Sequence, residues 1–221
     1  MQTLYITLNV RVSKHISLAF KLFSKDSNAL GVLSLKAERS FMDPNEEKKL
    51  IKAAQGGDGR AFNALLQEYY DVMYRIAFKW CGNRENAEDV TQNACIKLAR
   101  NIGTFRFESK FSSWLYKLVI NTAKDWQKAN LRHKSVPLPE DSPLGITAPE
   151  GEAHIYAQQV MNAVRALPDK EKIAILLVCG EELSHAEAAA IMDCKESTVS
   201  WYIHEARKKL EDLKEKERRH G

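Results

Sequence analysis

The sequence predicts an all-α protein with two small helical domains, joined by an acidic, proline-rich linker and preceded by a poorly ordered extension. Apolar residues recur at helical spacing in every long segment from Met42 onward. Four of the six prolines fall within residues 135–152, which hold four acidic residues and no Lys or Arg. We therefore expect an extension at 1–41, a first domain at 42–134, a flexible linker at 135–152 and a second domain at 153–221.

The extension carries a pattern that the rest of the chain does not match. Apolar and polar residues alternate over residues 4–12 as in a β-strand, but no partner strand follows. The first helix start comes later, where Asp43 can act as N-cap, Pro44 suits the first helical position and Glu46 has capping-box spacing. We expect Met42 to be the true start and residues 1–41 to be a non-native or disordered extension, with a basic transit peptide as the alternative.

In the first domain, turn residues separate long amphipathic segments. Gly56 and Gly57 end the first segment, and Gly82 and Asn83 break the chain again after the second. The second segment has the clearest apolar stripe, running from Phe62 to Ile76. We expect helices at residues 44–55, 60–80, 85–101 and 112–131.

Positive charge and aromatic rings gather at the end of this domain. Residues 100–134 hold eight Lys or Arg against two Asp or Glu, a net charge of +6, whereas residues 42–99 sum to −1. Six aromatic residues fall within positions 105–126. The charge alone fits a solvated helix face equally well. Cations interleaved with rings favour a surface for single-stranded nucleic acid, because cations hold phosphates and rings stack on exposed bases.

The second domain ends in a pattern typical of a helix-turn-helix. Ser184 can cap a helix at His185–Met192, with a turn at Asp193 and Cys194 and a second helix capped by Ser197 or Thr198. Inward positions are predicted at Val199, Ile203, Ala206 and Leu210. Such a second helix enters the DNA major groove in many proteins, although helix pairs without DNA function share the outline. The expected exposed face consists of Lys195, Ser197, Thr198, Ser200, Trp201, Tyr202, His204 and Arg207.

Motifs for other classes of function are missing. The chain has no H-E-x-x-H and no G-x-S-x-G, and the glycines at 56–59 lack the Lys of a phosphate-binding loop. The four cysteines form no C-x-x-C pair, and no run of eighteen apolar residues exists. We therefore expect a cytoplasmic protein that is not an enzyme, uses no cofactor or metal, and does not insert into a membrane.

Residues 42–210 resemble the extracytoplasmic-function (ECF, group 4) sigma factors of bacterial RNA polymerase. The resemblance rests on Asn86–Ala94 and Phe105–Trp126 for sigma region 2, and on Ala166–Lys170, Glu182–Met192 and Ser197–Leu210 for region 4. It implies a region 2 helical bundle and a region 4 helix-turn-helix. It also implies a sigma factor that binds core RNA polymerase, directs it to promoters and helps to open the −10 element.

The resemblance implies the following site residues and partners. Asp89, Gln92 and Asn93 match the surface that docks on the clamp helices of the largest polymerase subunit; the flap of the second largest subunit is a further expected contact. The residues matching the −10 DNA site are Phe105, Arg106, Phe107, Lys110, Phe111, Trp114, Asn121, Lys124, Gln127 and Lys128.

Region 4 is expected to read the −35 element as duplex, through the exposed face described above. Basic residues often stand in the family where this chain has Ser200, Trp201 and Tyr202. The two rings either contact thymine methyl groups, or one of them is partly buried. Family membership further implies an anti-sigma partner. The alternative function is a stand-alone two-domain regulator that binds DNA without polymerase.

Overall fold

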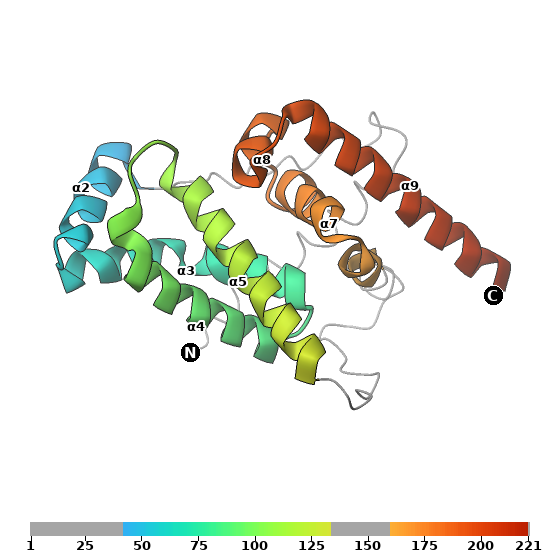
Figure 1. Cartoon of the computed structure of the whole chain (residues 1–221), viewed down its shortest axis with the longest axis horizontal. Helices are drawn as coiled ribbons and strands as arrows, with labels where there is room; N and C mark the ends of the chain where they lie inside the picture. Colours follow the sequence, from blue (N-terminus) through green and yellow to red (C-terminus); the bar gives the residue numbers. More distant parts are fainter. Residues whose placement is uncertain (1–41, 134–159, 221) are drawn as a thin grey trace, which may run out of the picture. The chain divides into compact units, whose positions relative to one another are not determined.

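The computed structural model describes residues 42–133 and 160–220, with side chains described over 42–130 and 160–212 (Figure 1). The described elements are all helical, which confirms the all-α prediction. The described residues fall into two compact units, which we call the first unit (42–133) and the second unit (160–220). None of the described helices combines the length and apolar character needed to cross a bilayer. The predicted extension, the strand-like alternation at 4–12 and the predicted linker lie outside the described residues.

The first unit begins with four long helices close to those predicted. They are α2 (Pro44–Gln55), α3 (Gly59–Cys81), α4 (Arg84–Asn101) and α5 (Phe111–His133), with a short 3-10 turn, η1 (Ile102–Thr104), after α4. Asp43 caps α2 by accepting hydrogen bonds from the backbone N–H groups of Asn45 and Glu46. The predicted N-cap is thereby confirmed.

Helix α3 is the centre of the first unit and packs against α2, α4 and α5 (Figure 1). Its apolar stripe is buried at Leu65, Tyr69, Met73 and Ile76. Gly82 ends the helix with φ 83°, a left-handed conformation that glycine adopts without a steric penalty. An ion pair between Lys97 Nζ and Asp125 Oδ2, 2.8 Å apart, joins α4 to α5 on the surface.

The second unit contains a helix at residues 160–166, then α7 (Asp169–Ile175), the π turn η2 (Leu176–Gly180), α8 (His185–Met192) and α9 (Glu196–His220). Sequence reasoning did not predict α7. The sequence features that mark the start of α7 are Pro168, which precedes the helix, and the acidic residues Asp169 and Glu171 in its first turn.

Helix α9 starts earlier than expected. Ser197 and Thr198 were predicted as its N-cap, but both lie inside its first turn. The reason is that the carbonyl oxygen of Lys195 already accepts from the N–H groups of Thr198 and Val199, at 2.9 and 3.2 Å. The predicted inward residues Val199, Ile203, Ala206 and Leu210 are all buried, which confirms the register of the helix.

An ion pair holds α9 on α7. Lys209 Nζ lies 2.6 Å from Glu171 Oε1, and the Glu171 carboxylate is buried whereas the lysine is partly exposed. The other carboxylate oxygen, Glu171 Oε2, is buried without a hydrogen-bond partner. Removing Lys209 would leave a buried charge uncompensated.

The central position of α3 predicts a large effect of truncating Leu65. Leu65→Ala should lower the free energy of unfolding of the first unit by about 2–5 kcal/mol, because the side chain is fully buried. Ile96→Ala removes a similar volume from an exposed position and should cost far less. Hydrogen exchange of the α3 amides in the full chain measures both, and equal losses would contradict the assignment of the core.

Candidate nucleic-acid interface

A cluster of aromatic rings underlies the loop between η1 and α5. The ring centroid of Phe105 lies 4.9 Å from that of Phe107, 5.3 Å from that of Phe111 and 5.6 Å from that of Trp114. Phe105 and Phe111 are only 5% and 2% exposed, whereas Phe107 is 36% exposed. The predicted site residues Phe105 and Phe111 therefore support the loop from beneath, and the ring it displays is Phe107.

Phe107 is held in an unfavourable backbone conformation. Its φ of 61° lies in the left-handed region, which costs a non-glycine residue about 1–2 kcal/mol. Such strain persists only where the surrounding contacts impose it, and it is concentrated at functional sites. The ring is exposed, and so are Arg106 and Lys110 in the same loop.

Tyr69 connects the ring cluster to α2. Its ring packs edge-on against Phe111 with 5.2 Å between centroids, and its hydroxyl donates a short hydrogen bond to Glu47 Oε1. Burial, and then the bond to the Glu47 carboxylate, raise the pKa of Tyr69 far above its ordinary value. The phenol therefore stays protonated and remains a donor across the physiological pH range.

The predicted residues of α5 form one face of the helix. Trp114, Asn121, Lys124 and Lys128 lie within about 80° of one another around the helix axis, because each residue advances by about 100°. Asn121 and Lys128 are exposed, and Trp114 and Lys124 are partly exposed. This face combines a ring, an amide and two cations, which suits contacts with bases and phosphates.

Gln127 lies beside that face and has a defined orientation. The indole Nε1–H of Trp80 donates to its side-chain oxygen at 2.9 Å. An indole nitrogen can only donate, so the amide oxygen of Gln127 must face Trp80 and the amide NH₂ group is turned away. Any partner of that NH₂ group must offer an acceptor. Sequence reasoning missed Trp80, since it lies 47 residues earlier in the chain.

The predicted residues on α4 also share a face. Asp89, Gln92 and Asn93 are all exposed and follow the i, i+3, i+4 spacing of one helix face. Ile96 continues the same face and is 49% exposed, although it is a large apolar residue. A single exposed apolar residue is ordinary by itself, so the case for a protein-binding surface here rests on the shared face of the predicted polar residues. The exposure of Ile96 was not predicted.

The helix-turn-helix of the second unit has the predicted geometry. Ser184 and Glu187 form a capping box at the start of α8. Asp193 has φ 50° and ψ 51°, a left-handed conformation, at the position where the turn was predicted. Aspartate tolerates this conformation better than most residues other than glycine and asparagine.

The residues predicted to contact the −35 DNA divide into an exposed set and a partly buried set. Ser197, Ser200, Trp201, His204 and Arg207 are exposed along one side, and Lys195 is exposed in the turn before the helix. Thr198 and Tyr202 lie at the flank and are partly buried. The Tyr202 ring packs against Trp201 with centroids 5.2 Å apart, and Lys170 Nζ lies 6.0 Å from its centroid. Trp201 is 55% exposed.

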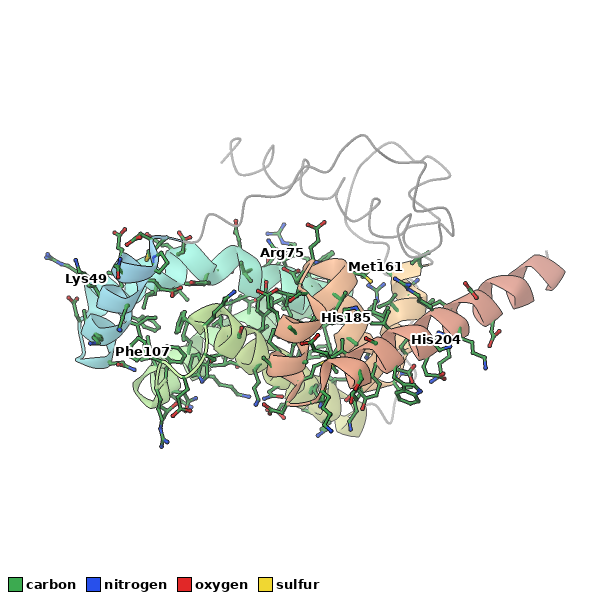
Figure 2. All side chains as sticks on the ribbon, turned by 90° about the horizontal axis from the view of Figure 1, so that it is seen from above. Lys49, Arg75, Phe107, Met161, His185 and His204 are labelled. Atoms are coloured by element: carbon green, nitrogen blue, oxygen red, sulfur yellow. The ribbon has the colours of Figure 1, made fainter. Side chains whose placement is uncertain are left out.

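A hydrogen bond joins the two helices of this motif near the predicted DNA face. Ser200 Oγ donates to the carbonyl oxygen of Glu196 at 3.1 Å and lies 2.9 Å from His185 Nδ1. Ser200 thus links the end of the first turn of α9 to the first residue of α8. Figure 2 labels His185 on α8 and His204 on α9.

Metal sites and reactive thiols would be the other kinds of chemical site in the part of the chain that the structure describes. No group of three or more His, Cys, Asp or Glu there is placed to hold a metal ion. Burial raises the pKa of the Cys95 and Cys194 thiols, which lowers the fraction of reactive thiolate.

Comparisons with known proteins match both units. The model of the sigma-70 region 2 family matches residues 65–133, and that of sigma-70 region 4 matches residues 157–210. The ECF RNA polymerase sigma-E factor of Haemophilus influenzae is 33% identical over 75% of this chain and 94% of its own. The ECF sigma factor SigW of Bacillus subtilis is 31% identical over 75% and 97%.

Among solved structures, the sigma factor RpoE of Bartonella quintana, crystallised with the anti-sigma factor NepR, shares the fold. Its TM-score is 0.56 at 20% identity, and the match covers 70% of this chain and 96% of the other.

The turn of the helix-turn-helix generates a prediction about stability. Asp193→Val should lower the free energy of unfolding of the second unit by about 1–2 kcal/mol, because a β-branched residue is strained at φ 50°. Asp193→Gly removes the same side chain without strain and should change it by less than about 0.5 kcal/mol. Hydrogen exchange of α8 and α9 in the full chain measures both. Equal decreases in the free energy of unfolding would show that the Asp193 side chain, rather than its backbone conformation, determines the stability of the turn.

Proposed function

This chain belongs to the ECF sigma factors, and from that premise we propose which of its residues make each promoter and polymerase contact. As a sigma factor it binds core RNA polymerase, directs the polymerase to promoters and helps to open the DNA at the −10 element. Its partners are core polymerase and promoter DNA. The assignments below rest on the geometry of the two units taken separately.

The first unit captures a base of the −10 element. The observation that carries this assignment is the exposed ring of Phe107, displayed over the buried rings of Phe105 and Phe111. An unstacked base gains stacking energy on such a ring, while cations nearby hold the strand by its phosphates. Binding the open form more tightly than the closed form shifts the equilibrium toward melting without ATP. The remaining contacts come from Arg106, Lys110, Trp114, Asn121, Lys124, Gln127 and Lys128.

The second unit binds the −35 element in duplex form. Helix α9 enters the major groove with its exposed side, and Arg207 and Lys195 supply the charge for phosphate contacts. Trp201 is exposed enough to contact a thymine methyl group, whereas Tyr202 and Thr198 support the motif from its flank. Ser200 and His204 complete the polar part of this face.

The face of α4 docks on core polymerase. Asp89, Gln92 and Asn93 supply polar contacts to the clamp helices, and Ile96 supplies an apolar contact in the middle of the same face. The second unit would meet the polymerase flap. We place the domain boundaries at 42–134 and 153–221, with the linker between them.

The chain has no catalytic activity of its own and works in the bacterial cytoplasm, where the polymerase is. Its known relatives are sigma factors, which assist a polymerase rather than perform chemistry. The related fold of Bartonella quintana RpoE was solved with an anti-sigma factor. An anti-sigma protein that covers the promoter-binding faces is therefore the expected regulator of this chain.

Run-off transcription from a genomic promoter library tests the assignment as a whole. A restricted set of promoters should be transcribed when the chain is added to bacterial core polymerase, and none when it is left out. A stand-alone regulator would bind promoter fragments tightly by itself and would add no initiation to core polymerase.

Replacing Phe107 tests base capture. Phe107→Leu should reduce open-complex formation by roughly 5- to 100-fold, because base–ring stacking is worth about 1–3 kcal/mol. Phe107→Tyr keeps the ring and should retain most activity. Fluorescence of 2-aminopurine in the −10 strand reports the unstacked base. Full opening by Phe107→Leu would remove Phe107 from the site.

Replacing Arg207 tests duplex binding by the second unit. Arg207→Ala should weaken protection of the −35 region and lower the slope of log K against log salt by about 0.9, since one phosphate contact is lost. Arg60→Ala removes an exposed arginine of the first unit and serves as the control for charge. DNase footprinting of the holoenzyme at several salt concentrations measures both, and identical footprints would exclude Arg207.

A further inference from the structure

We propose that α2 is part of the single-strand DNA site, with Gln55 as a positioning residue for the loop and Lys48 as a phosphate-binding cation. The inference deepens the proposed function and rests on the assignment of base capture to Phe107. It concerns two residues of α2, of which Gln55 lies 50 positions before Phe105 and Lys48 lies earlier still, in a segment (42–99) whose net charge is −1.

Gln55 ties the loop to α2 through two hydrogen bonds. Its Nε2 donates to the carbonyl oxygen of Ile102 at 2.9 Å and to that of Phe105 at 2.8 Å. Both hydrogens of the amide are therefore used, and carbonyl oxygens can only accept, so the orientation of the side chain is unambiguous. The second bond lies two residues before Phe107. Gln55 thereby fixes the chain immediately before the strained residue.

Lys48 brings a cation to the exposed ring. Its Nζ lies 5.9 Å from the ring centroid of Phe107, within the range of a cation–π interaction. Lys48 and Gln55 are seven residues apart and share the face of α2 that meets the loop. Lys49 is also exposed, but it lies about 100° around the helix from Lys48. Figure 2 labels Lys49 on α2 and Phe107 in the loop.

The ligand that fits this arrangement is a nucleotide of a single strand. A base stacked on Phe107 brings its own phosphate to the same place, and the lysine ammonium sits on a flexible stem that can follow it. Lys48 thus adds a cation at the Phe107 ring to the exposed Arg106 and Lys110 of the same loop. Charge-assisted contacts of this kind strengthen binding of the strand whose base is stacked on Phe107.

The first experiment compares two lysines of one helix. The full chain, bound to core polymerase, is titrated with a promoter whose −10 region is a pre-melted bubble. Lys48→Ala should weaken binding by about five- to tenfold, as expected for one charge-assisted contact. It should also lower the slope of log K against log salt by about 0.7. Lys49→Ala carries the same charge change and should alter neither quantity.

The second experiment tests the positioning role of Gln55. Gln55→Glu replaces two donors by a carboxylate that faces two carbonyl oxygens, and it should reduce 2-aminopurine unstacking by about tenfold. Binding to an upstream duplex fragment should not change. Gln67→Glu makes the same charge change at an exposed position of α3. Unchanged hydrogen exchange of α3 would show that the first unit remains folded.

The outcomes separate the inference from the function on which it rests. Equal effects of Lys48→Ala and Lys49→Ala would remove Lys48 from the site, and equal effects of Gln55→Glu and Gln67→Glu would remove Gln55. If Phe107→Leu still abolished base capture, only the role of α2 would be overturned. If Phe107→Leu had no effect either, base capture by the loop would fail as well. Should Gln55→Glu unfold the first unit, the comparison of the two lysines still decides.

Discussion

The buried ring of Phe111 touches three other rings: Tyr69 at 5.2 Å, Phe105 at 5.3 Å and Trp114 at 5.7 Å. These rings come from α3, from the loop and from α5, so one cluster joins three segments of the first unit. Aromatic pairs add about 0.5–1.5 kcal/mol each beyond the area they bury. The cluster therefore stabilises the loop enough to hold the next exposed ring at an unfavourable backbone angle. Phe111 thus adds to the direct contact between Phe105 and Trp114 in holding the loop against α5.

Much of this arrangement follows from periodicity. The long helices, the cap at Asp43, the capping box at Ser184 and the left-handed Asp193 all rest on local signals, which act within four residues. The remainder depends on contacts between distant segments. Sequence pattern could not tell which of the loop's phenylalanines is exposed, because the loop has no regular period and the answer depends on Tyr69 of another helix.

Side-chain hydrogen bonds between residues distant in the sequence could not be predicted from sequence pattern either. The bonds from Trp80 to Gln127 and from Gln55 to the loop span 47 and up to 50 residues. No motif connects such positions, and only the folded backbone brings them together. Helix α7 was missed for a different reason. It has only seven residues and is followed at once by a π turn, so its apolar positions complete no recognisable stripe.

Helix α9 runs without a break from Glu196 to His220, and Lys209, which contacts Glu171 of α7, lies on the C-terminal side of the residues proposed to contact DNA. Twelve residues separate Lys209 from Ser197, which is about 18 Å of helix. The ion pair with Glu171 is one of the contacts that set the tilt of the helix, together with its buried residues Val199, Ile203 and Leu210. A tilt of the helix by about 5° about Lys209 would displace Ser197 by about 1.5 Å, half the donor–acceptor distance of a hydrogen bond. A shift of that size would misplace the side chains proposed to contact DNA at the start of α9. Their position is fixed by the Lys209–Glu171 ion pair together with the buried residues Val199, Ile203 and Ala206.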